Sequence, residues 1–426
     1  MANITVNSDL ALFNERAVQT DIQSEKIVDY HPRSAESGGP FEFIIAGSGD
    51  EYIDLNKIDV NIKFKILKAD GSAIAAADEV GINNLGIATI FRDVTLTVAE
   101  SQIEGGQQDY AYKSYFRTVA QFHPAAQVSH MRAFGWIKDE AGKFDDKTNT
   151  GFVKRQALIA GSRVCELHGP VYLDFFNQPR KLITNTPLRL KFTLQKPEFL
   201  LNAYKAADYK ISVNDITVYG RRLLMNPSVI QGHMKGLDKL NASYPITHSK
   251  LFTYTIPKGQ KSFRKDDLFP SSNPKLLMVA MVTNEAYNGT LDLNPFNFQH
   301  FDLDEISLLV NGKSYPGPLY KPDFANNNYV RDYCDCMEVF NYYNTDDTNG
   351  LTYKEYGNGY TIYAFDLTPD SNISSDHRHP NLGHGIRLDI KFKTDLAKSI
   401  NVLVYACFDS EVQITKLRDI IHDYNL

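Results

Sequence analysis

Apolar and polar residues alternate along many short stretches of this chain. Between Ile58 and Ile66, isoleucine, valine and phenylalanine alternate with aspartate, asparagine and lysine. Leu188–Leu194 and Leu388–Phe392 show the same period of two, which is typical of a strand with one buried and one solvated face. Composition and local turns predict further strands at Phe41–Ile45, Tyr52–Leu55, Phe91–Val98, Val171–Phe176, Tyr209–Leu224, Lys250–Ile256, Leu276–Thr283, Glu305–Val310, Thr361–Leu367 and Ile400–Phe408.

Two stretches show a helical period instead. Apolar and aromatic residues recur at i, i+3, i+4 and i+7 within Tyr110–Phe122, and a second stripe of this kind runs through residues 329–340. Phe122–Lys154 is mixed in character and rich in Gly and Asp. It is predicted to be an extended surface loop that carries the only tryptophan, Trp136.

The predicted elements occur twice in the same order. Leu188–Leu194 followed by Tyr209–Tyr219 matches the two strands within Gly385–Ile414, and each helical stripe lies at the same relative place in its half. A chain of 426 residues is also long enough for two domains. About eight short strands per half, with long connections, favour a jelly roll over an immunoglobulin-like sandwich. The predicted fold is all-β, with two tandem eight-stranded jelly rolls and short helices in the connecting loops.

Breaks in these patterns give the expected domain limits. Residues 1–40 end in a stretch rich in Ser, Gly and Pro and are predicted to form an amino-terminal arm. Residues 41–225 form the first jelly roll, 226–243 a linker without sustained periodicity, 244–416 the second jelly roll and 417–426 a carboxyl-terminal tail.

Composition and charge narrow the functional classes. Hydrophobic residues make up 43% of the chain and charged residues 23%, and 24 Tyr and 25 Phe favour pleated, half-buried surfaces. A net charge of −6 argues against a protein that mainly binds nucleic acid. The sequence contains no apolar run of membrane-spanning length, and its amino terminus lacks the layout of a secretory signal. Cys165, Cys334, Cys336 and Cys407 show no metal or disulfide spacing, so we expect reduced thiols and synthesis in the cytosol.

Candidate metal sites are weak. His377, His379 and His384 resemble a cupin cluster, but residues 381–383 lack the glutamate that such a site requires, so a solvated loop is favoured. If Asn344–Gly350 belonged to an EF-hand loop with Gly350 at the turn, Tyr356 would stand at the last ligand position, where an acid is required. An EF-hand is therefore excluded, and the binding of some other cation here is the alternative. No catalytic group and no cofactor are predicted.

The run Lys258–Lys265 is basic and contains one aromatic residue. Contact with DNA or with an acidic neighbour is one interpretation, and a solvated loop is the favoured one.

Three phrases resemble a known family. Asn294–Pro316 (NPFNFQHFDLDEISLLVNGKSYP) is similar to a segment of the second jelly roll in major capsid proteins of large double-stranded DNA viruses. Residues 47–66 and 358–369 resemble capsid proteins of Maverick/Polinton elements and adintoviruses, which belong to the double jelly-roll lineage of adenovirus hexon. The resemblance extends from about Phe41 to Ile414. The chain is shorter than relatives with large tower loops, so we expect little outer decoration.

The resemblance implies a major capsid protein that forms homotrimeric, pseudo-hexagonal capsomers of an icosahedral double-stranded DNA virus shell. The implied location is the virion, the implied partners are further copies, vertex (penton) proteins and minor capsid proteins, and neither enzymatic activity nor specific nucleic-acid binding is expected. Besides the aromatic stripes of the two helices, the expected self-assembly contacts are Leu10, Leu12, Phe13, Ile420, Ile421 and Tyr424.

A carbohydrate-binding protein or a glycan hydrolase built from tandem jelly rolls is the alternative. The Tyr-rich loops could stack on sugar rings. This alternative requires a concave site where carboxylates or aromatic rings converge.

Overall fold

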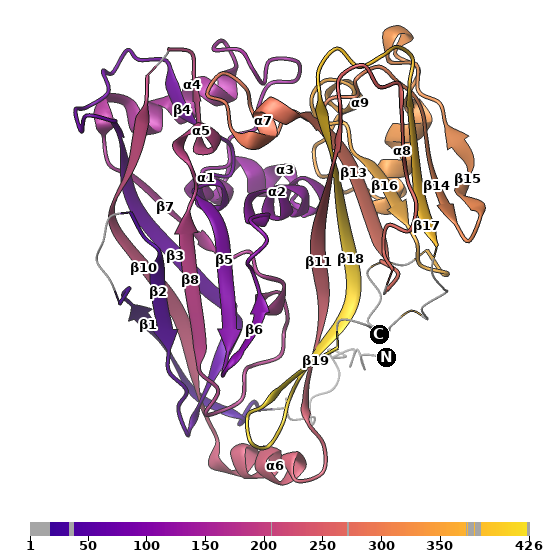
Figure 1. Ribbon diagram of the computed structural model, residues 1–426. Helices are drawn as coiled ribbons and strands as arrows, with labels where there is room; N and C mark the ends of the chain where they lie inside the picture. The colour runs from indigo at the N-terminus through magenta and orange to yellow at the C-terminus, as the bar shows by residue number, and fades with distance from the viewer. Residues whose placement is uncertain are drawn as a thin grey trace, which may run out of the picture.

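Two β-sandwiches stand side by side in the computed structural model, with their strands running roughly along the long axis of the molecule (Figure 1). The structure describes residues 18–33, 38–205, 207–270, 272–371, 373, 379 and 385–423. Most of the helices lie towards one end of the sandwiches or between them, and α6 (Pro227–Leu237) crosses the opposite end. No helix in the described part of the chain is long and apolar enough to span a membrane.

The first sandwich contains two four-stranded antiparallel sheets. Their orders are β1-β10-β3-β7 and β2-β8-β5-β6. The strands are β1 (Ile22–Tyr30), β2 (Phe41–Ile45), β3 (Glu51–Lys68), β5 (Phe91–Val98), β6 (Ser101–Glu104), β7 (Cys165–Pro170), β8 (Leu188–Leu194) and β10 (Tyr209–Met225). A short ribbon of β4 (Val80–Ile82) and β9 (Leu201–Ala203) lies beside them.

The second sandwich repeats this arrangement strand for strand. Its sheet orders are β11-β18-β13-β16 and β12-β17-β14-β15, so each strand takes the position of its counterpart in the first half. The strands are β11 (Ala242–Ile256), β12 (Ser262–Lys265), β13 (Leu276–Thr283), β14 (Leu303–Val310), β15 (Lys313–Tyr320), β16 (Tyr363–Asp366), β17 (Ile386–Phe392) and β18 (Ile400–Ile414), with β19 (Ile420–Asp423) paired to the end of β18. The predicted double jelly roll is confirmed.

The helices lie in the connections, as predicted for the fold. They are α1 (Gly86–Thr89), α2 (Tyr110–Gln121), α3 (Pro124–Val128), α4 (Thr150–Ile159), α5 (Pro197–Leu200), α6, α7 (Asn284–Asn288), α8 (Val330–Val339) and α9 (Tyr353–Tyr356). The two predicted helical stripes correspond to α2 and α8, which follow equivalent strands, β6 and β15, in the two halves. The helical period of the sequence therefore predicted both of these helices correctly.

Most strand predictions hold because one face of each strand is buried. The limits predicted for β5, β8 and β13 coincide with the structure. The two strands predicted at Tyr52–Leu55 and Ile58–Ile66 form one strand, β3. A register shift against β10, between the pairs Gly220–Ile58 and Arg221–Asp54, accommodates the irregular residues between them.

Two predicted segments differ from the structure. Val171–Phe176 is not a strand: the sheet pairing ends at Pro170, and a 3-10 turn at Asp174–Phe176 buries the apolar residues by packing. Phe122–Lys154 is not a surface loop either. It folds into α3, a 3-10 turn and the start of α4. Trp136 is only 1% exposed: its ring packs against Tyr115, and its indole N–H donates to Gln127.

The predicted arm, linker and tail contribute regular structure. Residues 22–30 form β1 and pair with β10, so this part of residues 1–40 is a sheet strand rather than an arm. β1 lies at a sheet edge with most of its side chains exposed, which removes the apolar alternation that would have revealed it. The segment 226–243 contains α6, and residues 420–423 of the tail form β19.

Deleting residues 2–31 removes β1 and exposes the backbone of β10 as a long sheet edge. We expect thermal unfolding to occur at least about 5 °C lower, since ~2 kcal/mol corresponds to such a shift in domains of this size, together with a greater tendency to aggregate. Deleting only residues 2–9, which keeps β1 and the expected contact residues Leu10, Leu12 and Phe13, is the control and should leave the melting temperature within about 1 °C of the parent. Equal melting temperatures for the two truncations would contradict a structural role for β1.

Candidate functional site

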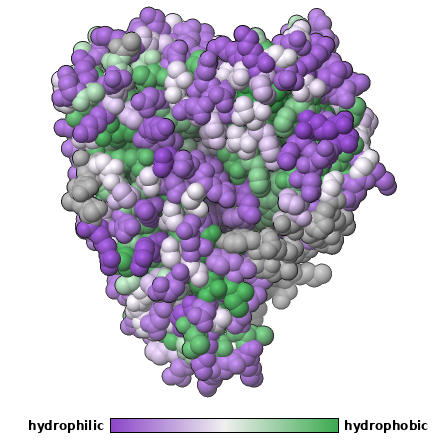
Figure 2. Space-filling model, viewed as in Figure 1, coloured by the Kyte–Doolittle hydropathy of each residue, from purple (hydrophilic) through white to green (hydrophobic). Residues whose placement is uncertain are grey.

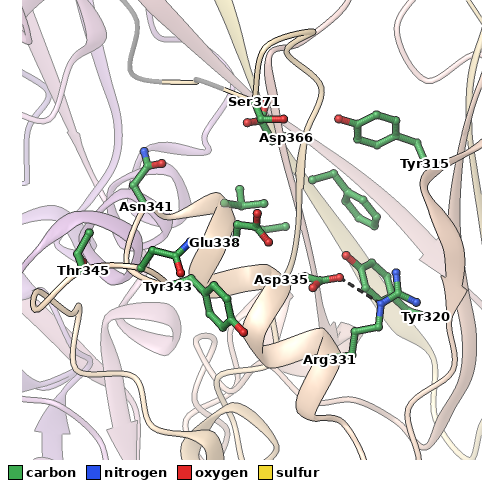
Figure 3. Close-up of a pocket in the computed structure, with 14 residues that line it drawn as sticks. Tyr315, Tyr320, Arg331, Asp335, Glu338, Asn341, Tyr343, Thr345, Asp366 and Ser371 are labelled. Carbon is green, nitrogen blue, oxygen red and sulfur yellow. Dashed lines mark ion pairs between the residues drawn. The ribbon is translucent and has the colours of Figure 1, made fainter.

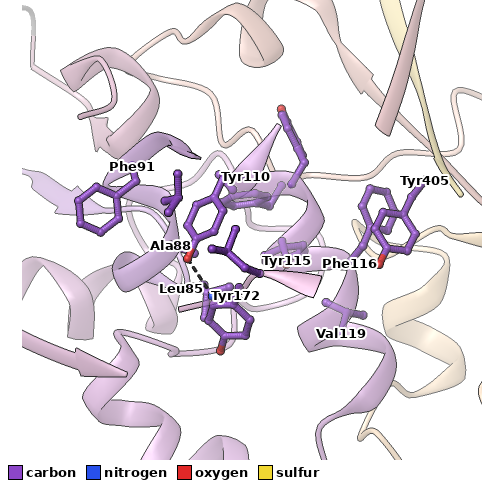
Figure 4. Close-up of a cluster of buried hydrophobic side chains, with 14 of the residues drawn as sticks. Leu85, Ala88, Phe91, Tyr110, Tyr115, Phe116, Val119, Tyr172 and Tyr405 are labelled. Carbon is purple, nitrogen blue, oxygen red and sulfur yellow. Dashed lines mark hydrogen bonds between the residues drawn. The ribbon is translucent and has the colours of Figure 1, made fainter. Parts of the chain in front are cut away.

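Helix α2 joins the two jelly rolls through an aromatic stack. It arises from the first half and lies between the sandwiches (Figure 1). The ring of Tyr115 stacks on Phe296 with 4.1 Å between centroids, and Phe116 stacks on Phe298 at 5.1 Å and on Tyr405 at 5.4 Å. Figure 4 shows Phe116 facing Tyr405 across this junction. The two halves thus share one continuous core.

The aromatic stripe of α2 is therefore internal. In α2 the side chains of Tyr112, Tyr115, Phe116 and Val119 are all buried within the chain. In α8, Cys336 and Met337 are buried as well. The prediction that the α2 stripe forms contacts between subunits is wrong, because the second jelly roll covers it. Tyr333 and Phe340 of the α8 stripe are only partly buried, so a subunit contact through them stays a prediction.

Buried polar contacts reinforce the junction. The Arg155 guanidinium pairs with Asp139 at 2.6 Å, with both side chains at most 1% exposed. The backbone carbonyl of Asp139 accepts a hydrogen bond from the Tyr360 hydroxyl in the second half at 3.0 Å. Asp145 accepts from the Asn294 backbone N–H at 2.6 Å and from the Asn297 amide at 2.7 Å. The Arg155–Asp139 pair fixes the loop between α3 and α4 within the first half, and the other three contacts attach this loop to the second jelly roll.

A second polar group, which we call the junction cluster, contains Glu104, Lys113, Asp174, His248 and Ser249. Glu104 accepts hydrogen bonds from the backbone N–H groups of Asp174 and Phe175 at 3.0 and 3.1 Å. Asp174 in turn accepts from the Ser249 backbone N–H at 2.7 Å and from its hydroxyl at 2.8 Å. The Lys113 ammonium lies 3.8 Å from Asp174. The cluster links the first half to strand β11 of the second.

Burial determines the protonation of this cluster. Desolvation and the neighbouring Asp174 raise the pKa of Glu104 to about 8, although Lys113 and the two backbone donors act in the opposite sense. Desolvation lowers the pKa of His248 to about 4, against the attraction of Asp174. The pKa of Lys113 is raised despite its burial, because Asp174, Asp109 and Glu104 surround it.

Among the residues that the structure describes, the junction cluster also supplies the one group of three potential metal ligands. Donor atoms of Glu104, Asp174 and His248 lie within 4.8 Å of one another. Lys113 already provides a positive charge beside Asp174, so the cluster is balanced by an ammonium. Sequence reasoning missed it because the three residues are 70 or more positions apart and no local spacing marks them.

A polar groove opens on the second jelly roll between β15, α8 and β16. Its volume is about 530 Å³, and Figure 3 shows tyrosines and carboxylates around it. Arg331 stacks over Tyr320 at 5.0 Å and pairs with Asp335 at 3.4 Å. The tyrosines and carboxylates that line the groove are Tyr315, Tyr320, Tyr343, Asp335, Glu338 and Asp366. Burial raises the pKa of Asp366, and Tyr343 is 54% exposed.

The structure describes some of the predicted contact residues and candidate metal ligands, and others lie outside the described residues. Leu10, Leu12, Phe13, Tyr424, His377 and His384 lie outside the described residues. Ile420 packs against the core and Ile421 is 47% exposed, so only the latter offers substantial surface for a contact.

His379, the one histidine of the predicted cluster that the structure describes, contacts two acids. Its ring nitrogens lie 2.9 Å from Asp370 and 3.5 Å from Asp409. The structure thus provides no observation that brings the three histidines together.

The prediction of reduced thiols is confirmed for the cysteines of β7 and β18. Cys165 and Cys407 are buried free thiols, and Cys334 and Cys336 are also free. Desolvation raises the pKa of Cys165 to about 11 and that of Cys407 to about 12. Neither thiol is poised as a nucleophile at neutral pH.

Comparison with known proteins shows a weak sequence relationship and an extensive structural one. No protein-family model matches the sequence. An uncharacterized protein of Caenorhabditis elegans is 26% identical over 425 residues, which cover 95% of this chain and 98% of that protein.

Among solved structures, the chain is similar to the Sputnik virophage structure, with a TM-score of 0.67 and 14% identity over 98% of this chain and 92% of the other. It is also similar to the mavirus major capsid protein (TM-score 0.55, 11% identity, 100% and 95% covered) and to the Faustovirus major capsid protein (0.54, 9%, 95% and 92%). These neighbours are double jelly-roll viral capsid proteins, and at such identities the likeness establishes the shared fold.

Asp139→Asn leaves the Arg155 charge buried without a charged partner. We expect the free energy of unfolding to fall by about 3–5 kcal/mol, because the low-dielectric interior cannot solvate the guanidinium. Chemical denaturation followed by circular dichroism measures this change. Glu285→Gln breaks the exposed pair with Lys398, whose side chains are both 58% exposed, and serves as the control, with an expected change below about 1 kcal/mol. A similarly small effect at Asp139 would show that the buried pair does not stabilise the fold.

Proposed function

We propose that the chain is a major capsid protein, forming homotrimeric, pseudo-hexagonal capsomers of an icosahedral double-stranded DNA virus shell. The supporting observation is the whole-chain likeness to solved capsid proteins, which spans 95% or more of this chain and extends through both jelly rolls. The proposed role is structural rather than enzymatic. The proposed location is the virion, after synthesis in the host cytoplasm.

The architecture supports this proposal physically. A threefold trimer of a chain with two equivalent sandwiches presents six similar bodies around its axis, and this outline tiles a hexagonal lattice. The arrangement requires that the two sandwiches keep a constant relation within each subunit. The buried stack of Tyr115 on Phe296 and the hydrogen bond from the Tyr360 hydroxyl to the Asp139 backbone carbonyl contribute this rigidity.

We assign the proposed self-assembly contacts to the end of the molecule that carries α6. The described chain starts there: the Asn226 backbone N–H donates to the Asp21 carbonyl at 2.8 Å, beside the start of α6. Arg418, in the turn between β18 and β19, contacts Met234 of α6. The arm with Leu10, Leu12 and Phe13 and the tail with Ile420, Ile421 and Tyr424 are therefore attached to the same end. Figure 2 shows small hydrophobic patches at this end of a mainly hydrophilic face.

The proposal also covers the virus group, the partner proteins and the limits of the two jelly rolls. The two phrases within residues 47–66 and 358–369 support a place in the Maverick/Polinton and adintovirus group of the hexon-like lineage. Vertex (penton) proteins and minor capsid proteins are the proposed heterologous partners. The proposed jelly-roll limits of 41–225 and 244–416 extend at their amino-terminal ends to include β1 and the start of β11.

Purified protein at micromolar concentration should exist as trimers. Mass photometry is expected to give a main species at three times the 48.1 kDa chain mass, and negative-stain images should show triangular or hexagonal particles with a threefold axis. Ile421→Ser should weaken association between such particles, whereas Val164→Ser, an equally exposed apolar residue on the first jelly roll, should not. A protein that stays monomeric under all buffer conditions would overturn the proposal.

The groove on the second jelly roll supports a second candidate function, the binding of a carbohydrate. It meets the requirement for a concave site in which aromatic rings and carboxylates converge, and its 530 Å³ volume suits a small ligand. Three carboxylates and one arginine would disfavour acidic sugars and favour neutral ones. The exposed ring of Tyr343 is the expected stacking platform.

A glycan array probed with the purified protein tests this second candidate. Saturable binding to a neutral glycan that is lost at least tenfold in Tyr343→Ala, and kept in Tyr219→Ala on the first jelly roll, would support it. Tenfold corresponds to about 1.4 kcal/mol, within the range for one aromatic contact. The absence of any bound glycan would exclude it, and turnover of a bound glycan that ceases in Glu338→Gln would instead indicate a hydrolase.

A further inference from the structure

A groove of about 260 Å³, which we call the junction groove, lies where α3 and α4 of the first jelly roll meet the second. Helix α3, the chain between α3 and α4 and the first turns of α4 form most of its lining, and Gly350 of the second half completes it. Trp136 and Ile137 are 1% and 8% exposed and form its floor, whereas Val128 at its edge is 66% exposed. The junction groove therefore has an apolar floor and an apolar edge.

Hydrogen bonds hold the walls of the junction groove in place. The Gln127 side-chain amide donates to the backbone carbonyl of Phe122 at 2.8 Å and to that of Asn349, in the second half, at 2.9 Å. The same side chain accepts the indole N–H of Trp136 at 3.2 Å. A ligand thus meets a preformed surface, which lowers the entropic cost of binding.

The junction groove carries positive charge that the chain does not neutralise. Its described lining contains Arg132, Lys138 and Lys154 and no carboxylate. Lys138 donates to the Gly350 carbonyl at 2.6 Å and pairs with Glu355 at 2.8 Å. Arg132 and Lys154 are exposed, and within the part of the chain that the structure describes neither forms an ion pair. Two uncompensated cations therefore flank an apolar depression on a chain whose net charge is −6.

We propose that the junction groove binds an acidic peptide segment of a partner protein, in which an apolar side chain lies between two carboxylates. The apolar side chain packs on Val128 above the floor of Trp136 and Ile137 and so leaves water. The carboxylates pair with Arg132 and Lys154. The junction groove is complete within a single chain, so the proposal does not depend on the proposed capsid role.

Nucleic acid matches the junction groove less well than a peptide does. Binding of backbone phosphates requires a cluster of Lys and Arg, and only two unpaired cations are present. Trp136 is the one aromatic residue of the described lining, and at 1% exposure its ring cannot stack on a base. Val128 and Val153, the latter 48% exposed beside Lys154 on α4, instead present methyl groups to an apolar side chain.

Peptide arrays test the proposal with the purified full-length protein. One array carries octapeptides with two acidic residues around one apolar residue, and a matched array carries lysine in place of each acid. The peptides that bind are then titrated in solution by fluorescence anisotropy. We expect saturable binding of acidic peptides only.

Three variants locate the binding site. Arg132→Gln/Lys154→Gln should weaken binding at least tenfold, since both charged contacts are lost, and Val128→Ser should weaken it at least threefold. Arg189→Gln/Lys191→Gln removes two exposed cations from β8 and is the matched control, which should bind as the wild type does.

Reversal of charge gives a result that damage to the fold cannot imitate. Arg132→Glu/Lys154→Glu should lose the acidic peptides and bind the lysine peptides instead, because the sign of the charge beside the apolar floor is inverted. Both side chains are exposed, so the melting temperature should stay within about 2 °C of the wild type.

Four outcomes would overturn the proposal. The first is that no acidic peptide binds, and the second is binding that Arg132→Gln/Lys154→Gln leaves unchanged, which would locate the site elsewhere. The third is tighter binding of a short single-stranded DNA that the same variant abolishes, which would identify a nucleic-acid site. The fourth is tighter binding of a peptide of residues 8–16 of this chain, in which Asp9 and Glu15 flank apolar residues, because the occupant would then be a second copy.

Discussion

The stacking of α2 on the second jelly roll is the interaction on which the rest of the structure depends. Each sandwich has its own interior, but Tyr115 and Phe116 merge the two interiors through Phe296, Phe298 and Tyr405. Helix α2 belongs to a long connection between strands, yet it joins the two jelly rolls instead of facing solvent. Because aromatic stacking is strongly dependent on geometry, this joint sets the orientation of the halves as well as their attachment.

The sequence predicted what local periodicity can encode. The spacing of apolar residues indicates the element and its buried face where one face is buried. This holds for strands such as Leu188–Leu194 and for helices with one apolar stripe such as α2. β1 lacked that signal because its edge position leaves most side chains in water. Trp136 was misplaced because it is buried against Tyr115, which lies 21 positions earlier on α2, and no local pattern records such a contact. The junction cluster was invisible for the same reason, since its members meet only in the folded chain.

The comparison with solved capsid proteins illustrates how little sequence this fold requires. Identities of 9–14% accompany matching architecture over nearly the whole chain. What persists is the alternation of buried and exposed positions and the order of strands in each sheet, and many different residues satisfy these conditions. The two halves of this chain make the same point internally, because their sheet orders correspond although their loops differ.

The outer edge of β1 has a consequence for the solubility of the protein. An open strand of nine residues is a template for the addition of foreign strands, and thus for fibrous aggregation. Here the edge carries Glu25, Lys26 and Asp29, with Glu25 paired to Arg221 and Lys26 to Glu51. Burying these charges against an incoming backbone would be costly. The charged edge of β1 thereby disfavours strand addition between copies of the protein at high concentration.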